Sequence, residues 1–354
     1  MPRLFLALVA FVAMFVRSSA AQDVNVIVPA TGDAYWTVLA FSRDGRILRE
    51  FASISPAAAG QSWEVRVITY RAATGQIIHQ ENLPPDTRFD SATSDGRTAV
   101  IFVDKDPPEA RRHFFLLDTD TGETQDIPSA WLNPNDGQPS AAISGDGRLV
   151  STFSDSGPEE SPLIVTVYDW QTKKQVARQM AGLPAGGGSD GGVTADGKIE
   201  FSYSRSGSDI VDPKTGRLLV QLGTDAFRSA DGTWIVEFPF QPYVDPENWP
   251  KEVTIKDGEN GRVLGRLDLE LTDDQANAMW RGAFCGPSGR FVAASNDAVL
   301  IYQIPSGKRI ARFPAESWRE AEAKGYPAVT VACSWDGKRI AIRSGARLTL
   351  RDVK

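Results

Sequence analysis

The feature that most constrains this chain is a short sequence pattern that returns seven times along it. Each copy consists of an apolar segment, a turn of the form Ser-x-Asp-Gly or a close variant, and a second apolar segment, and the copies lie about 50 residues apart. The copies occupy residues 41–48, 92–102, 143–153, 193–203, 228–238, 285–295 and 333–342. This period is typical of repeat architectures, in which each unit buries its apolar faces only against its neighbours.

The Asp-Gly pair at the centre of the pattern predicts a tight β-hairpin. Gly adopts the positive φ that such a turn needs without steric cost, and Asp can hydrogen-bond to its own backbone. The apolar residues on both sides are typical of strands buried between two layers. The residues to which we assign this structural role are Asp44, Gly45, Asp95, Gly96, Asp146, Gly147, Asp196, Gly197, Asp231, Gly232, Asp336 and Gly337.

A second turn falls between successive copies of the first, for example within 115–127 and 209–220. Each unit is therefore expected to hold four antiparallel strands, A to D, with an Asp-Gly turn between A and B and a Thr-Gly turn between C and D. Asp118, Asp169 and Asp212 take the same place at the end of strand C. We expect their carboxylates to accept backbone N–H bonds from the turn.

Seven four-stranded units predict an all-β fold, a seven-bladed β-propeller. The last copy ends after its strand C, at 347–353, whereas 23–29 form an extra strand ahead of the first strand A. We therefore expect Val24, Val26 and Val28 to supply the missing outer strand of the last blade. This pairing would join the two ends of the chain and close the ring.

The pattern, including its offset ends, resembles the WD-repeat-like propellers that are common among exported bacterial proteins. The resemblance covers nearly all of the chain beyond the first 21 residues. At strand C the Trp-Asp pair that names the WD-repeat family is replaced by Tyr168-Asp169 and Leu117-Asp118, and the Gly-His pair is missing. The resemblance implies a propeller that serves as an interaction platform, although propellers also host lyases, hydrolases and quinone-dependent dehydrogenases.

The first 21 residues are typical of a secretory signal peptide. Arg3 precedes an apolar run, Leu4 to Val16, which is shorter than the roughly 20 residues that a membrane-spanning helix needs. We expect cleavage near Ala21, a periplasmic or secreted location, and a single propeller domain over 22–354. A retained membrane anchor is the alternative.

The formal net charge is −7 and the chain has no basic tract, so nucleic acid and anionic membranes are poor partners. We expect a monomer without a cofactor. The two cysteines, Cys285 and Cys333, hold the same place in successive copies, where other copies have apolar residues. They are either small buried side chains or, in an oxidising compartment, a disulfide between blades 6 and 7.

Groups that could catalyse a reaction are few. His79 and His113 belong to outer strands, and the chain has too few His and Cys residues for a metal cluster built from them. Residues 118–123 resemble the start of a calcium loop, but they coincide with the repeating C–D turn and lack the distant Glu. The run 186–192 lacks the Lys-Ser/Thr of a phosphate loop, so we interpret it as a flexible connection between blades.

The B–C and D–A connections vary in length, and we expect them to share one face of the ring, opposite the short turns. Capping boxes at 272–275 and 317–320 predict short helices between blades 5 and 6 and between blades 6 and 7. Aromatic side chains on these connections bring contact area at low entropic cost. The candidate ligand-binding residues are Tyr243, Trp249, Trp280, Trp318 and Tyr326. The alternative is that each ring packs its own connection onto the blades.

Two functions remain open. The first is an exported, non-enzymatic interaction module that binds a protein or peptide on the face of the B–C and D–A connections. The second is a propeller enzyme that acts on a glycan or small metabolite through carboxylates near the ring axis, with Asp190, Asp273 and Asp274 as candidates. The scarcity of catalytic groups favours the first.

Overall fold

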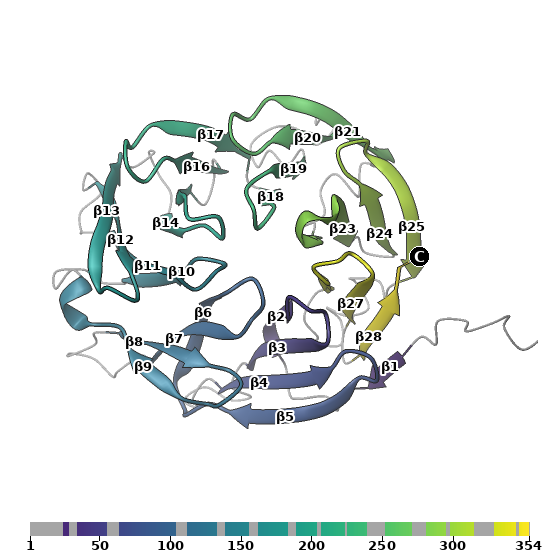
Figure 1. The fold of residues 1–354 in the computed structure, drawn as a ribbon, viewed down its shortest axis with the longest axis horizontal. Helices are drawn as coiled ribbons and strands as arrows, with labels where there is room; N and C mark the ends of the chain where they lie inside the picture. Colours follow the sequence, from purple (N-terminus) through teal and green to yellow (C-terminus); the bar gives the residue numbers. More distant parts are fainter. Residues whose placement is uncertain are drawn as a thin grey trace, which may run out of the picture.

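The ring architecture is plain in the computed structural model. The model describes residues 24–27, 34–54, 64–103, 112–132, 139–155, 162–182, 189–203, 207–223, 225–238, 252–270, 281–294, 298–314, 329–344 and 347–353. These residues form seven four-stranded sheets arranged radially around an axis (Figure 1). The seven-bladed, all-β propeller predicted from the repeat is confirmed. The two helices expected within 271–280 and 315–328 lie outside the described residues.

In each blade the first strand lies nearest the axis and the fourth lies at the rim (Figure 1). Blade 1 consists of β2 (Ala34–Phe41), β3 (Ile47–Ile54), β4 (Glu64–Arg71) and β5 (Gln76–Asn82), and blade 2 of β6 (Thr87–Ala92), β7 (Thr98–Val103), β8 (His113–Asp118) and β9 (Thr124–Asp126). Blade 3 consists of β10 (Ser140–Ile143), β11 (Leu149–Asp155), β12 (Leu163–Asp169) and β13 (Lys174–Ala181), and blade 4 of β14 (Ser189–Val193), β15 (Ile199–Tyr203), β16 (Gly207–Val211) and β17 (Leu218–Leu222). Blade 5 consists of β18 (Asp225–Arg228), β19 (Trp234–Phe238), β20 (Glu252–Asp257) and β21 (Val263–Glu270), and blade 6 of β22 (Arg281–Phe284), β23 (Arg290–Ala294), β24 (Ala298–Gln303) and β25 (Lys308–Pro314). Blade 7 consists of β26 (Thr330–Cys333), β27 (Arg339–Ser344), β28 (Arg347–Asp352) and β1 (Val24–Ile27).

Six of the seven A–B turns share a hydrogen bond from a Ser or Thr hydroxyl to the Asp carboxylate two residues later. In blade 1 the Ser42 hydroxyl donates to Asp44 Oδ1 at 2.6 Å, and the same oxygen accepts the N–H of Arg46 at 3.0 Å. These two bonds lower the pKa of Asp44, because they favour its ionised form. The hydroxyl-to-carboxylate bond recurs in the pairs Thr93–Asp95, Ser144–Asp146, Thr194–Asp196, Ser229–Asp231 and Ser334–Asp336. Each turn then ends in a glycine with positive φ, such as Gly45 at 67°.

The first and the last of the described strands meet in blade 7. Strand β1 pairs antiparallel with β28, with Val24 opposite Leu350 and Val26 opposite Leu348. The predicted closure of the ring by the N-terminal strand is therefore confirmed, although Val28 lies outside the described residues.

A buried ion pair joins the last blade to the first. Arg343 on β27 and Glu50 on β3 are 2% and 0% exposed, and the Arg343 Nε lies 3.0 Å from Glu50 Oε1. The Tyr70 hydroxyl donates to Glu50 Oε2 at 2.6 Å, and burial raises the pKa of this phenol, which keeps its proton in place. Since both charges are shielded from water, each depends on the other for compensation.

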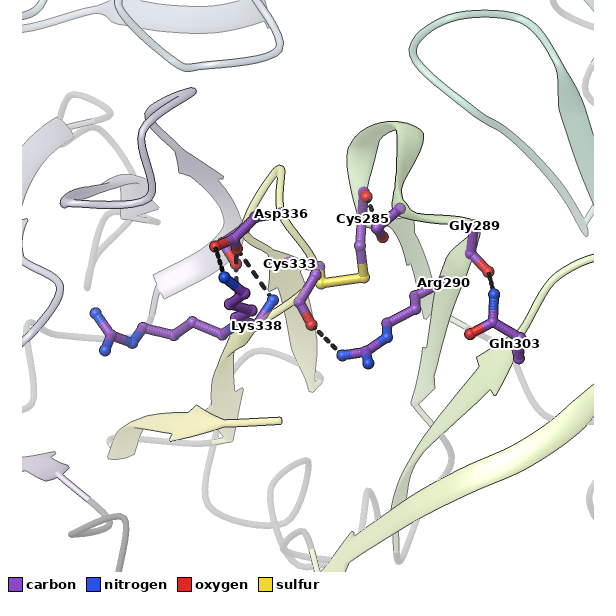
Figure 2. The surroundings of a disulfide bond; sticks show 11 residues. Cys285, Gly289, Arg290, Gln303, Cys333, Asp336 and Lys338 are labelled. Atoms are coloured by element: carbon purple, nitrogen blue, oxygen red, sulfur yellow. Dashed lines mark hydrogen bonds and ion pairs between the residues drawn. A yellow bond between two sulfur atoms is a disulfide. The ribbon is translucent and has the colours of Figure 1, made fainter. Parts of the chain in front are cut away.

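Cys285 and Cys333 form a disulfide between blades 6 and 7 (Figure 2). Cys285 follows the inner strand β22, Cys333 ends the inner strand β26, and their Cα atoms are 4.8 Å apart. Cys285 is fully buried among apolar residues of the two blades. Of the two alternatives left open by the sequence, the structure has the disulfide.

Removing this disulfide should lower the stability of the ring. The bond closes a loop between residues 48 positions apart, so the double variant Cys285→Ser, Cys333→Ser should lose about 2–4 kcal/mol in free energy of unfolding through a less restricted unfolded chain. Urea unfolding measures this loss. The wild type in a strong reductant should show the same shift, and the double variant should not respond to reductant. Equal unfolding midpoints for all samples would contradict the prediction.

The Glu50–Arg343 pair should behave as a unit. Arg343→Met leaves a buried carboxylate without its counter-charge and should cost about 3–5 kcal/mol. The triple variant Glu50→Leu, Tyr70→Phe, Arg343→Met should recover most of that loss, because it also removes the Tyr70 hydroxyl that donates to Glu50. Urea unfolding of the three proteins provides the comparison. The exposed pair Arg266–Glu252 is the control, because Arg266→Met should change stability by less than about 1 kcal/mol. A triple variant that is less stable than Arg343→Met would show that the charges are not coupled in this way.

Candidate functional site

The five aromatic residues predicted to bind a ligand, Tyr243, Trp249, Trp280, Trp318 and Tyr326, all lie outside the described residues. So do the candidate carboxylates Asp273 and Asp274. In the sequence, residues 239–251 fall between β19 and β20, residues 271–280 between β21 and β22, and residues 315–328 between β25 and β26. Asp190 is the one residue of the two predicted sets whose surroundings the structure describes.

Trp131 shows what an aromatic residue on one of these connections can do. It ends a short 3-10 helix, η1 (Ser129–Trp131), between blades 2 and 3. Its ring stacks on Tyr168 with centroids 4.0 Å apart and meets Trp170 edge-on, and its carbonyl accepts a bond from the Thr152 hydroxyl. Trp131 therefore packs its own connection onto blade 3.

A polar cavity of about 280 Å³ lies at the inner edge of blades 2, 3 and 4. Its polar side chains come from the inner strands β6, β10 and β14 and from β15, and they are Asp90, Ser91, Ser140, Asp190, Glu200 and Ser202. Its lining contains no Lys, Arg or His. Ser140, Asp190 and Ser202 stand near the strand ends that lead into the B–C and D–A connections. We name this the axial cavity.

A β-bulge turns Asp90 toward the neighbouring blade. On β6, Phe89 pairs with Ile101 and Ser91 pairs with Val100, so Asp90 is the extra residue without a cross-strand partner. Its Oδ2 accepts the N–H of Ala141 on β10 at 2.9 Å. This bond satisfies a donor on the inner edge of blade 3, where the sheet itself has no further strand.

The surroundings of Asp90 disfavour its ionised form. Burial raises its pKa to about 7, and the nearby carboxylate of Asp190 pushes in the same direction. The N–H bond from Ala141 and the charge of Arg112 favour the ionised form but do not compensate fully. Asp90 can therefore hold or release a proton close to neutral pH.

Asp190 stands at the second position of β14, between two blades. Its Oδ1 accepts the Ser140 hydroxyl of blade 3 at 2.7 Å and the N–H of Gly191 at 2.7 Å. The interpretation of 186–192 as a flexible connection is wrong for its second half, since β14 begins at Ser189. A Cβ on Gly191 would lie 2.9 Å from the Phe153 ring, and one on Gly192 would lie 2.8 Å from Ala142. These glycines are needed for close contact between blades.

Glu200 on β15 is the third carboxylate of the axial cavity. Burial raises its pKa, and the charges of Asp190 and Asp196 add to that effect, whereas a bond from Ser208 and the charge of Arg228 oppose it. Glu200 also lines a second cavity of about 290 Å³ between blades 4, 5 and 6. Glu200 therefore lies between the two cavities, the second of which has a mixed lining that includes Arg228, Leu222 and Phe227.

Asp90 and Glu200 were not among the site residues predicted from the sequence. Asp90 looked like one polar residue in an alternating strand, because a bulge cannot be read from a single strand without its partner. Glu200 follows an Asp-Gly turn and takes a polar position in a strand where polar and apolar residues alternate. One feature of the sequence could have identified them: Asp90 falls in a strand A and Glu200 in a strand B, and in a propeller these two strands lie closest to the axis.

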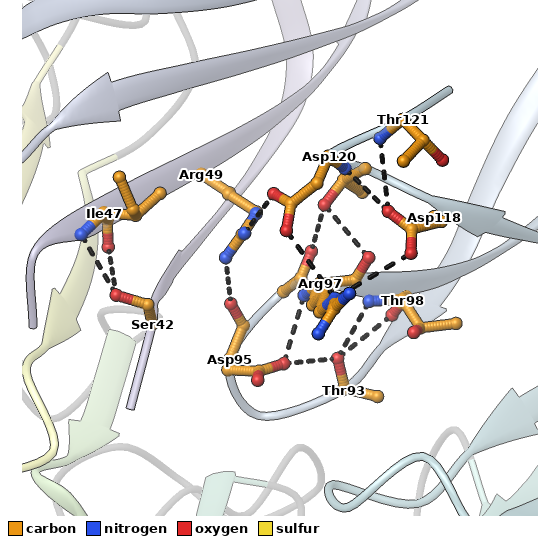
Figure 3. Close-up of polar contacts among 12 residues, drawn as sticks. Ser42, Ile47, Arg49, Thr93, Asp95, Arg97, Thr98, Asp118, Asp120 and Thr121 are labelled. Atoms are coloured by element: carbon orange, nitrogen blue, oxygen red, sulfur yellow. Dashed lines mark hydrogen bonds and ion pairs between the residues drawn. The ribbon is translucent and has the colours of Figure 1, made fainter. Parts of the chain in front are cut away.

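On the turn face, which carries the A–B and C–D turns, carboxylates bind backbone N–H groups and cations of the protein itself (Figure 3). Asp118 Oδ1 accepts the N–H groups of Asp120 and Thr121 at 2.9 and 3.2 Å. Asp120 forms an ion pair with the buried Arg49 of blade 1, and Arg49 also donates to the carbonyl of Asp95 at 2.9 Å. The segment that resembles a calcium loop is therefore paired with cations of the protein and ties blade 2 to blade 1.

The two histidines lie on the outer part of the ring, each near a carboxylate. The ring Nε2 of His79 is 3.7 Å from Glu81, and that of His113 is 4.0 Å from Asp126. Within the described ranges, no group of three or more His, Cys, Asp and Glu side chains is arranged to hold a metal ion. No helix in this part of the chain is long and apolar enough to cross a membrane.

The titration of Asp90 should affect stability with a definite sign. Its pKa is higher in the folded protein than in the unfolded chain, so the stability that it contributes is complete at acidic pH and is lost as the pH rises toward about 7. Asp90→Asn keeps an acceptor for Ala141 but removes the charge. From about pH 5 to pH 8, the free energy of unfolding of the variant should rise by about 1–2 kcal/mol relative to the wild type. Urea unfolding at the two pH values tests this, and a constant difference between the two proteins would contradict it.

No protein-family model matches the chain, and no curated protein matches its sequence. Among solved structures it is similar to hydrazine synthase from Kuenenia stuttgartiensis, with a TM-score of 0.53 and 16% sequence identity over 93% of this chain and 98% of that chain. At this level of identity the likeness supports the propeller fold alone.

Proposed function

We propose that this chain is an exported, WD-repeat-like binding module of the periplasm or the extracellular space. It takes a protein or peptide partner on the face formed by the B–C and D–A connections, and the partner places a basic side chain in the axial cavity. Export rests on the signal-peptide pattern of the first 21 residues, with the propeller domain following from residue 22.

The two faces of the ring differ in how many polar groups they leave free for a ligand. On the turn face, carboxylates such as Asp44 and Asp118 accept bonds from their own turns, and Asp120 pairs with Arg49. In the axial cavity, Asp90, Asp190 and Glu200 meet hydroxyl and N–H donors but no basic side chain in the lining. The described lining of the cavity thus holds three carboxylates and no basic side chain, and the charges of Arg112 and Arg228 outside the lining offset them only in part.

The observation that carries the proposal is this cavity, with three carboxylates and three serines in a space of about 280 Å³. A Lys or Arg side chain supplies both the positive charge and the donors that such a lining accepts. The carboxylates that repel one another in the free protein would gain a shared partner, which favours binding. The aromatic residues expected on the connections of blades 5 to 7 would add apolar contact area for the same partner.

Two variants test this proposal with a defined probe. Peptides selected from a random display library against the wild-type ring should be enriched in Lys or Arg, and a selected peptide should bind Asp190→Asn at least 10-fold more weakly. The triple variant Trp249→Ser, Trp280→Ser, Trp318→Ser should lose binding, while its circular-dichroism spectrum and melting temperature stay nearly unchanged. Fluorescence polarisation measures the affinities.

The matched control is Glu259→Gln, because Glu259 is an exposed carboxylate on a C–D turn of the opposite face. It should bind the selected peptide as the wild type does. Selected peptides without basic residues, or equal binding by Asp190→Asn and the wild type, would contradict the proposed site.

One observation favours a second candidate, an enzyme that acts on a glycan or small metabolite. Asp90, with a pKa of about 7, can donate a proton near neutral pH, and Asp190 provides a second carboxylate in the same cavity. An oligosaccharide panel followed by chromatography distinguishes the two candidates. Turnover that is lost in both Asp90→Asn and Asp190→Asn would support the enzyme, whereas intact peptide binding without turnover would support the binding module.

A further inference from the structure

The second cavity, of about 290 Å³ between blades 4, 5 and 6, adjoins the axial cavity, because Glu200 lines both. Its walls come from the inner strands β18 and β22, from the A–B turns of blades 4 and 5, and from the end of β17. We name it the aromatic cavity, after Phe227 and Phe284 in its lining. Its size is at the lower end of the range for ligand pockets, so it suits a single large side chain.

The two cavities lie at the same level along the ring axis. On β18 and β22, Ala226 and Gly282 stand two residues before the last residue of the strand, which is the position that Gly191 holds on β14 in the axial cavity. Strands β14 and β18 follow one another around the axis (Figure 1). One extended ligand that passes Glu200 can therefore place neighbouring side chains in both cavities.

The apolar part of the aromatic cavity belongs to a cluster of phenylalanine rings. Phe227 and Phe284 are both partly exposed, and each packs on the buried Phe291, with ring centroids 5.8 and 4.9 Å apart. Gly282 permits this packing, because a Cβ there would lie 2.5 Å from the Phe291 ring and 3.1 Å from the Phe227 ring. The rings therefore reach the backbone of an inner strand, and two of them form part of the cavity wall.

Two of the three charged side chains in the described lining of the aromatic cavity compensate each other. Arg228 Nη2 lies 2.7 Å from Asp196 Oδ2, and the two side chains are 10% and 11% exposed. Arg228 also donates to the carbonyl of Gly258. The pair therefore offers no net charge to a ligand, and the remaining charged group is Glu200, at the border with the axial cavity.

We propose that the aromatic cavity binds an aromatic side chain of the same partner whose basic side chain enters the axial cavity. The motif that the ring recognises is then one Lys or Arg and one aromatic residue at a fixed spacing. This inference rests on the binding function proposed above and adds the specificity of the site.

The two cavities favour different side chains for physical reasons. An aromatic ring in the aromatic cavity extends the cluster of Phe227, Phe284 and Phe291, since aromatic rings gain from offset or edge-to-face contacts. Its burial removes apolar area from water and places no unpaired charge beside Asp196 and Arg228. A basic side chain gains more in the axial cavity, where the carboxylates have no basic side chain in the lining.

The probes are fluorescein-labelled peptides with a Gly-Ser background, one Lys, and one Phe at a systematically varied distance before or after the Lys. At one spacing, the wild type should bind the Lys–Phe peptide at least about 10-fold more tightly than the otherwise identical Lys–Ala peptide. Fluorescence polarisation measures both affinities. Equal affinities for the two peptides at every spacing would overturn the inference.

Ala226→Leu tests the location, because it places a larger side chain in the aromatic cavity. It should weaken binding of the Lys–Phe peptide at least about 10-fold and leave the affinity for the Lys–Ala peptide unchanged. The matched control is Ala73→Leu, since Ala73 is exposed on the C–D turn of blade 1, and it should bind both peptides as the wild type does. Unchanged affinity of Ala226→Leu for the Lys–Phe peptide would overturn the inference.

A measurement on the wild type tests the location without any substitution. The photo-crosslinker p-benzoylphenylalanine, placed in the peptide instead of Phe, should react with residues of β18 or β22, and mass spectrometry identifies them. Crosslinks confined to other strands would overturn the inference.

Asp190→Asn separates the inference from the function on which it rests. If the Lys peptides bind the wild type, lose affinity in Asp190→Asn and gain nothing from the Phe, the aromatic cavity alone is wrongly assigned. If no peptide depends on Asp190, the proposed binding function fails and the inference fails with it.

Discussion

The ring depends on the burial of each blade's two apolar faces against the neighbouring blades. This also holds for the junction of blades 7 and 1, where the beginning and the end of the propeller sequence come together. A four-stranded sheet with two apolar faces is not stable alone, because its apolar area stays in water. The core therefore runs from blade to blade: Leu39, Phe41 and Tyr70 of blade 1 pack with Ala341 and Leu348 of blade 7. The junction of blades 7 and 1 has the same kind of apolar core as the other junctions. The pairing of β1 with β28 completes blade 7, whose residues form one side of that core.

Function in such a ring depends on where the repetition fails. Seven copies of one unit would give seven equal junctions, but two places differ from the rest. Between blades 2 and 4 the inner strands carry carboxylates that substitute for a missing neighbour strand, with Asp90 accepting the N–H of Ala141. At the junction of blades 7 and 1, blade 7 takes its outer strand from β1 rather than from a strand that follows β28. The first place concentrates carboxylates, and the second joins two strands that lie far apart in the sequence.

The sequence was sufficient for the fold and insufficient for the site, and the residues show why. The positions of Asp44 and Gly45 and of their equivalents are dictated by a local turn, so the pattern predicts the strands on either side of them. Asp90 and Asp190 act across blades, and their roles depend on a bulge and on contacts with residues about 50 positions away. Gly191 and Gly192 were interpreted as a loop because glycine usually marks one. Their real constraint is the approach of Phe153 and Ala142 from blade 3, which no local pattern encodes.

The carboxylates of the axial cavity have two roles that oppose each other, and this links stability to binding. Asp90 accepts the N–H of Ala141 and Asp190 accepts the Ser140 hydroxyl, so both carboxylates help to hold blades 2, 3 and 4 together. As neighbouring groups partly shielded from water, they disfavour each other's charge: burial raises the pKa of Asp90 to about 7, and the carboxylate of Asp190 adds to this effect. A proton on Asp90 relieves the repulsion in the free ring, and a cationic ligand would relieve it by the same electrostatic means. Proton and ligand should therefore compete, so that a basic partner binds more tightly as the pH rises through the pKa of Asp90.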